Sequence, residues 1–175
     1  MTEIEMNINM TDYLNLFKDK FVDDDIYSGH EMMGDKYAVE LAYIKEFRFA
    51  WFATQLNIFI AVSQFEDKIT KEVIEDYSKI IFEYSIKNHK GWPRGLQAGV
   101  GSISVLIGDN ATNDAIGFCE KLSKRHWSAF EVPVIINLSR KQTISFIKKP
   151  IWGAVYFPYI KMLIETKIDS LVKTI

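Results

Sequence analysis

The clearest pattern of apolar and polar positions along the chain lies in residues 46–63. Phe47, Phe49 and Trp51 occupy alternate positions, and a second alternating run follows over residues 56–62. A period of two is typical of strands, because successive side chains of a strand point to opposite faces. The pattern therefore predicts either a tight hairpin or one bent strand in this segment.

Three later segments have the spacing of amphipathic helices, with an apolar side chain at every third or fourth position. Thr70 is a favoured N-cap for the first helix, and Thr112 or Asn113 for the second. Pro158 suits the first turn of the third helix, because proline has no N–H to leave unsatisfied there. The sequence therefore predicts three helices in the part of the chain that follows the alternating segment.

Strand patterns separate these helices. Residues 103–107 form a short alternating run, residues 129–138 a nearly continuous apolar run, and residues 143–147 a return strand after a polar turn. The predicted order is β(β)-α-β-α-β-β-α. Strands separated by helices favour parallel pairs, and the late hairpin adds an antiparallel edge. We predict an α/β fold with a central mixed sheet of about 4–6 strands and helices on both faces.

This order of elements is similar to the core of a thioredoxin-like fold. In that fold a proline opens the strand after the second helix, and Pro133 lies near the start of such a strand here. The resemblance is one of architecture only. The redox CxxC is missing, and residues 64–67 read Gln-Phe-Glu-Asp in its place. The resemblance therefore implies a fold and no activity.

The N-terminal part of the chain carries weaker signals. Thr11 suits the N-cap of a short helix, residues 26–35 read as a loop, and residues 36–45 fit a helix or a strand equally well. A chain of 175 residues suits one hydrophobic core. We therefore predict a single domain, in which residues 1–45 form an N-terminal helical or irregular arm and residues 46–175 form the α/β core.

Charge is distributed unevenly along the chain. The net charge is −2 and the pI about 5.9, which does not favour a nucleic-acid partner. Residues 1–84 hold 17 acidic and 8 basic residues, a net charge of −9, whereas residues 85–175 hold 6 acidic and 13 basic residues, a net charge of +7. Such asymmetry is typical of a surface for an anionic partner, or of two halves whose charges offset each other in one fold.

The single cysteine, the acidic N-terminus and the length of the apolar stretches indicate a cellular compartment. Cys119 is the only cysteine, so no intramolecular disulfide can form and a reducing compartment is favoured. The acidic N-terminus is unlike a secretory signal, and no apolar stretch reaches the roughly 20 residues that span a bilayer. We therefore expect a cytoplasmic protein with no membrane partner.

Glycines and cations concentrate in the segment from Lys90 to Gly101, which holds four of the nine glycines. Glycine lets backbone N–H groups approach a ligand, and Lys90 and Arg94 could neutralise an anion. Phosphate-binding loops follow a strand and open a helix, whereas this segment precedes a strand and has neither GxGxxG nor GxxxxGK[ST]. The segment fits a long helix-to-strand connection equally well.

Three of the four tryptophans lie beside basic residues in predicted loops. Rings next to cations bind phosphates or nucleotides by stacking and charge, or form a protein interface, or cap the edges of the core. If the thioredoxin-like order holds, two of these loops converge with Glu131 at the end of the sheet near residues 64–70. The candidate ligand-binding residues are Lys90, Trp92, Arg94, His126, Trp127, Glu131, Lys148, Lys149 and Trp152.

The sequence offers little support for catalysis. The three histidines lie far apart without metal-binding spacing, and no GxSxG is present. Cys119 falls on the apolar side of a predicted helix, where a thiol is usually inert. The tripeptide at residues 131–133 has a proline where a two-carboxylate nuclease would carry a lysine. We predict no metal and no cofactor and assign no catalytic residue.

These observations favour a cytoplasmic, non-catalytic binding or regulatory domain with a basic, tryptophan-bearing surface. Its ligand would be an anionic small molecule or the acidic surface of a protein. A homo-oligomer held by the oppositely charged halves is one form of this hypothesis. The alternative is an enzyme that acts on a small phosphorylated or nucleotide substrate through Lys90, Arg94, His126 and Glu131.

Overall fold

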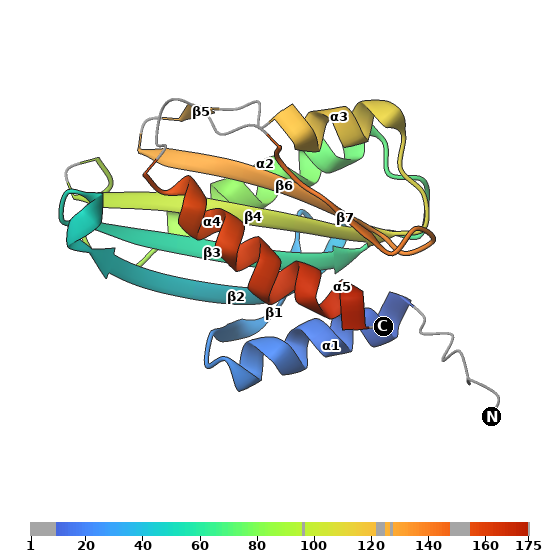
Figure 1. The fold of residues 1–175 in the computed structure, drawn as a ribbon, viewed down its shortest axis with the longest axis horizontal. Helices are drawn as coiled ribbons and strands as arrows, with labels where there is room; N and C mark the ends of the chain where they lie inside the picture. The colour runs from blue at the N-terminus through green and yellow to red at the C-terminus, as the bar shows by residue number, and fades with distance from the viewer. Residues whose placement is uncertain (1–9, 96, 122–124, 127, 148–154, 175) are drawn as a thin grey trace.

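The computed structural model describes residues 10–95, 97–121, 125–126, 128–147 and 155–174 (Figure 1). In chain order the elements are α1 (Met10–Asp23), β1 (Tyr27–Met33), β2 (Tyr37–Arg48), the 3-10 turn η1 (Phe49–Trp51), β3 (Thr54–Gln64), α2 (Lys71–Asn88), β4 (Ala98–Gly108), α3 (Asn113–Lys121), β5 (Arg125–His126), β6 (Ala129–Asn137), β7 (Gln142–Ile144), α4 (Phe157–Leu163), the π-helical turns η2 (Ile164–Asp169) and α5 (Ser170–Thr174).

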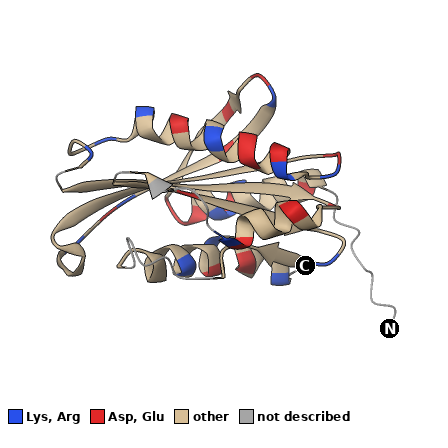
Figure 2. Ribbon diagram, turned by 90° about the horizontal axis from the view of Figure 1, so that it is seen from above, with Lys and Arg blue, Asp and Glu red and all other residues tan. Residues whose placement is uncertain are grey.

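The described strands form one seven-stranded sheet in the order β1-β2-β3-β4-β6-β5, with β7 paired to β6. The central pairs β3–β4 and β4–β6 are parallel, and the outer pairs are antiparallel. Helices lie on both faces of the sheet, which Figure 2 shows edge-on. The predicted α/β class with a mixed sheet is confirmed. Two strands beyond the main five, β5 and β7, have only two and three residues.

The periodic segments form the elements that their patterns predict. Residues 46–63 contain a hairpin rather than one bent strand, because Arg48 pairs with Thr54 across the β2–β3 turn. Thr70 caps α2, with its Oγ1 accepting a hydrogen bond of 3.4 Å from the N–H of Val73. Thr112 rather than Asn113 caps α3, because its Oγ1 accepts the N–H of Ala115.

The N-terminal part of the chain differs from the prediction. The predicted short helix is present as α1, but it begins at Met10, so Thr11 lies inside the helix and is not its N-cap. The predicted loop at residues 26–35 contains β1 instead, and residues 36–45, for which helix and strand fit equally well, belong to the strand β2. Apolar side chains of β2 alternate between the two faces of the sheet and are covered on both, with Val39 in one core cluster and Ala42 in the other. Burial on both faces hides the period of two by which a strand is recognised.

Two hydrophobic layers hold the helices on the sheet. The first layer packs α1, α4, η2 and α5 against one face, with Phe17 and Phe21 of α1 fully buried. The second packs α2 and α3 against the other face, where Tyr77 donates a buried hydrogen bond of 3.0 Å to the carbonyl of Ala61. Strand β4 lies between them and is buried along its whole length. The result is a rigid scaffold whose loops lie at the two ends of the strands.

Candidate functional site

The loop in the glycine-rich segment is shorter than the sequence suggests, because residues 98–101 belong to strand β4. Gly99 and Gly101 lie inside β4 and are buried. A Cβ on Gly101 would collide with the ring of Phe130, so this glycine provides room for an aromatic ring of the core. Gly91 and Gly95 adopt positive φ in the connection from α2 to β4. The glycines are thus explained by packing and by turns of the backbone.

The predicted position of His126 and Glu131 near residues 64–70 is wrong. Strand β6 runs parallel to β4 and begins with Ala129 opposite Val100, at the end of the sheet where β3 and β4 also begin. His126 and Glu131 therefore lie at the same end of the sheet as the loop that carries Lys90, Trp92 and Arg94. Residues 64–70 lie at the opposite end, where β3 stops. Parallel pairing decides this arrangement, because it places all strand starts together. Trp127, Lys148, Lys149 and Trp152 fall outside the described residues.

His126 and Glu131 form a hydrogen-bonded pair beneath α2. The Nε2 of His126 lies 2.6 Å from one carboxylate oxygen of Glu131, and Ser78 of α2 donates a hydrogen bond of 3.2 Å to the other. The side chain of Glu131 is only 5% exposed, and the imidazole stacks on Phe82 at 4.1 Å between ring centroids. The neighbouring hydroxyl of Ser102 is buried without a partner among the described residues.

A carboxylate-bound imidazole is one component of general acid–base catalysis. The serine of this array contacts the carboxylate instead of the imidazole, and in the described part of the chain only Glu131 hydrogen-bonds to the ring of His126. Glu131 instead accepts the hydrogen bond of the Ser78 hydroxyl and fixes the orientation of His126. The three side chains therefore form a buried polar contact that joins α2 to the sheet.

Cys119 is the buried thiol that the helix pattern predicts. It is fully buried in the α2–α3 layer. Burial, with a smaller contribution from Glu120, raises the pKa of the thiol far above its usual range. We expect the native protein to resist alkylation by iodoacetamide and to react rapidly once unfolded in guanidinium, because the thiolate is the reactive form. Mass spectrometry of the native protein against time measures this difference, and rapid native labelling would contradict it.

Four exposed aromatic rings gather at the end of the β2–β3 hairpin and on the neighbouring loop. We call this group, Phe47, Phe49, Phe52 and Trp92, the aromatic tip. Phe49 and Phe52 are 83% and 85% exposed, and Phe47 and Trp92 are 41% and 44% exposed. Phe47 packs edge-on against Phe49 at 5.2 Å and against Trp92 at 6.0 Å. Of these four, only Trp92 is among the candidate ligand-binding residues that the sequence predicts.

The base of the aromatic tip is held firmly. Trp51 is buried against Tyr156 and Tyr159 near the start of α4, and the guanidinium of Arg48 lies 4.9 Å from the Trp51 ring and 4.7 Å from the Tyr159 ring. Phe52 has a left-handed backbone, with φ of 55°. This conformation is rare for a bulky residue and persists where surrounding contacts hold it.

The loop that carries Trp92 is tied to the same hairpin. The hydroxyl of Tyr43 accepts a hydrogen bond of 3.1 Å from the N–H of Lys90 and lies 2.6 Å from the Oδ1 of Asn57. The N–H of Trp92 lies 3.5 Å from the Oε1 of Gln55, at the weak limit of a hydrogen bond. These contacts from β2 and β3 place Trp92 beside Phe47.

Basic residues surround the aromatic tip. Lys45, Arg48, Lys90 and Arg94 are exposed there, and Glu46 neutralises one of them through an ion pair of 2.9 Å with Arg48. The acidic residues of α2 lie mainly on the half of the helix that is farther from the loop carrying Lys90 and Arg94 (Figure 2). The tip thus combines exposed aromatic rings with positively charged residues next to them in the chain.

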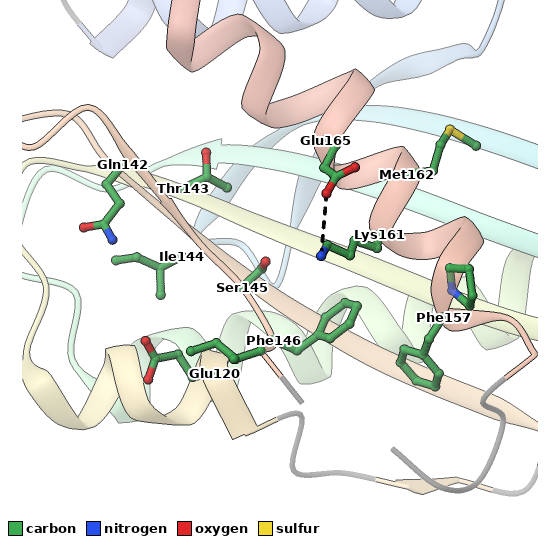
Figure 3. Close-up of a pocket in the computed structure, with 12 residues that line it drawn as sticks. Glu120, Gln142, Thr143, Ile144, Ser145, Phe146, Phe157, Lys161, Met162 and Glu165 are labelled. Carbon is green, nitrogen blue, oxygen red and sulfur yellow. Dashed lines mark ion pairs between the residues drawn. The ribbon is translucent and has the colours of Figure 1, made fainter. Parts of the chain in front are cut away.

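A groove of about 610 Å³ lies on another part of the surface, between β7, the end of α3 and α4 (Figure 3). Its apolar lining includes Phe146 and Phe157, which are buried, together with Ile147 and Met162, which are 71% and 37% exposed. Three charged residues contribute to it: Glu120 from α3, and Lys161 and Glu165, which form an ion pair of 3.8 Å. The sequence patterns gave no sign of this groove, because its walls come together only in the fold.

Among the described residues, no three histidine, cysteine or acidic side chains are grouped to hold a metal ion. No helix in the described ranges has the length and apolar character needed to cross a membrane. No family model, curated protein or solved structure matches this chain.

Proposed function

We propose that this chain is a non-catalytic protein-binding module whose aromatic tip docks into an apolar pocket with an acidic rim on a partner protein. The exposure of Phe49 and Phe52, at 83% and 85%, is the observation that carries the proposal. Single exposed apolar side chains are ordinary on protein surfaces, whereas a contiguous group is typical of an interaction site. Phe47 packs against both Phe49 and Trp92, so these three rings form one contiguous group, and Phe52 follows Phe49 in the same hairpin turn.

The charges around the tip indicate the chemistry of the partner. Lys45, Lys90 and Arg94 would lie against the rim of a pocket that receives the rings. Carboxylates at that rim would attract these cations and speed up association. Aromatic residues surrounded by arginine and lysine fit the usual division of an interface into a buried apolar centre and a polar rim.

The shape of the tip favours a protein pocket over a small ligand. Rings that are more than four-fifths exposed cannot enclose a small molecule, whereas binding sites for small molecules are concave. Edge-on packing of Phe47 against two rings and the buried base at Trp51 also hold the tip in one shape. Such preorganisation lowers the entropic cost of docking into a pocket of matching shape.

A double variant of the tip tests the proposal. We would replace Phe49 by serine and Phe52 by asparagine, since asparagine tolerates the left-handed backbone at position 52. Immobilised wild-type protein should retain a partner from an extract of the cells that naturally make it. The purified partner should then bind the double variant at least about 30-fold more weakly than the wild type, because this is the loss expected from removing an interface hot spot. Titration calorimetry measures this ratio.

A matched control removes two exposed apolar side chains elsewhere. Val22 and Met32 are 54% and 60% exposed and lie outside the tip, so Val22→Ser combined with Met32→Ser should leave affinity unchanged. Equal binding by wild type and tip variant would overturn the proposal. Tip-dependent binding to vesicles of anionic phospholipid without any protein partner would overturn it as well. A thermal shift with nucleotides or sugar phosphates would support the enzymatic alternative instead.

A further inference from the structure

We infer that the groove is a second binding site, in which an extended peptide of a partner protein is added as a further strand along the free edge of β7. In the described part of the chain β7 pairs only with β6, so its other edge has no neighbouring strand. The groove lies along this edge, between residues 142–147 and a wall formed by α4 and the start of η2 (Figure 3). This inference goes beyond the function proposed for the aromatic tip and does not depend on it.

The hydrogen bonds of β6 determine which main-chain groups of β7 point away from the sheet. The N–H of Leu138 donates to the carbonyl of Gly108 in β4, and successive residues of a strand direct their N–H and C=O to opposite sides. Asn137 therefore faces β7, where it is paired with Gln142. Because Gln142 bonds toward β6, the next residue of β7, Thr143, directs its N–H and C=O outward along the free edge.

The outward main-chain groups are open at two alternate positions. The same alternation directs Ser145 and Ile147 outward, and the N–H of Ile147 is already bound by the carbonyl of Glu120 at 3.2 Å. Among the described residues no backbone carbonyl accepts the N–H of Ser145, and only β6 pairs with Thr143. The hydroxyl of Thr143 is also buried without a partner in that part of the chain. Open N–H and C=O groups in a row are what an added strand pairs with.

The two walls of the groove indicate which side chains the peptide carries. Helices α3 and α4 cover opposite faces of the sheet, so successive side chains of a strand added to β7 would point toward each of them in turn. The α4 wall offers apolar Phe157 and Pro158, and its cation Lys161 is paired with Glu165. The α3 wall offers the carboxylate of Glu120, which forms no ion pair within the described ranges. The peptide that fits therefore alternates apolar with basic side chains.

Ser145→Pro tests the role of the free edge. Proline has no N–H, and at an outward position of an edge strand it leaves the bonds to β6 in place. The probe is an octapeptide of alternating valine and lysine with a fluorophore at its N-terminus, and fluorescence anisotropy measures its binding. The wild type should bind the probe saturably, and Ser145→Pro should bind it at least about tenfold more weakly. Ser145→Ala is the matched control, because it keeps the N–H and should bind like the wild type.

N-methylated probes test the same pairing on unaltered protein. In a paired strand only alternate residues direct their N–H groups toward the neighbouring strand. One probe is methylated at its valine amides and the other at its lysine amides, so one should lose binding and the other should retain it. Amide exchange at Thr143 and Ser145, followed by nuclear magnetic resonance, should slow at least about tenfold when the unmethylated probe saturates the protein.

Glu120→Gln tests the charge of the peptide. Loss of this carboxylate should weaken binding of the valine–lysine probe about threefold at low salt, the effect of a partly exposed ion pair. Glu66→Gln is the control, because Glu66 is exposed and does not line the groove, and it should leave the affinity unchanged. A probe of alternating valine and glutamate should bind more weakly than the valine–lysine probe.

Four outcomes would overturn the inference: no saturable binding of the valine–lysine probe, equal binding by a folded Ser145→Pro variant, equal effects of the two methylation patterns, or tighter binding of the valine–glutamate probe. Circular dichroism melts that match the wild type establish that each variant is folded. Should Ser145→Pro fail to fold, the methylated probes decide, because they require only the wild type. The proposed function of the tip stands or falls separately, since it is tested by Phe49 and Phe52.

Discussion

Replacing Trp51 by alanine should lower the free energy of unfolding by about 3–5 kcal/mol, the range for removing a large buried aromatic side chain. Trp51 is only 3% exposed and packs against Tyr156 and Tyr159, so the substitution leaves a cavity where the β2–β3 hairpin meets α4. It also removes a ring over which Arg48 lies. The effect should be among the largest in the protein.

Trp92→Ala provides the matched control, because Trp92 belongs to the same end of the molecule but is 44% exposed. Its cost should be well below that of Trp51→Ala, since surface substitutions usually change stability by about 0.5 kcal/mol or less. Urea denaturation followed by far-ultraviolet circular dichroism measures both values. Equal losses would show that Trp51 does not support the tip.

Replacing Glu131 by alanine should cost about 1–3 kcal/mol, because it leaves buried polar groups without a partner. Ser78 loses the acceptor of its hydrogen bond, and His126 loses the carboxylate at 2.6 Å. Glu131→Gln should cost less, because the amide keeps the volume of the side chain and one acceptor oxygen. Glu120→Ala is a matched control at a less buried glutamate outside this array.

A double-mutant cycle with His126→Ala separates the role of the pair from that of the single residues. If the array acts as one unit, the cost of both substitutions together should be smaller than the sum of the separate costs, with a coupling energy of about 0.5–3 kcal/mol. Chemical denaturation of the four proteins gives this value. Additive costs would show that His126 and Glu131 stabilise the fold independently.

Much of the fold follows from local patterns in the chain. The Thr70 cap and the helical spacing after it predict α2, and the alternation over residues 103–107 predicts the inner part of β4. These signals are local because a helix cap and a strand period depend on neighbouring residues. The same patterns predicted the element order and the parallel pairing, because a helix between two strands must cross over the sheet.

The candidate site could be predicted only in part. The sequence groups Lys90, Trp92 and Arg94 as a ring with neighbouring cations, and the structure places the ring of Trp92 against Phe47. The sequence does not single out Phe49 or Phe52 as site residues, because Phe49 belongs to an alternating run that a half-buried strand also shows, and Phe52 stands between Trp51 and Ala53 in an apolar stretch. The groove left no pattern, since β7, α3 and α4 each contribute a few residues from distant parts of the chain.

The sequence by itself determined the α/β class, the order of the elements after residue 46 and the buried position of Cys119, since each depends on the spacing of residues that are close together in the chain. The tertiary structure decided which apolar residues remain exposed. Trp51 and Phe49 lie two positions apart, yet α4 covers only Trp51. Coverage depends on contacts between segments far apart in the chain, and local patterns contain no information about them.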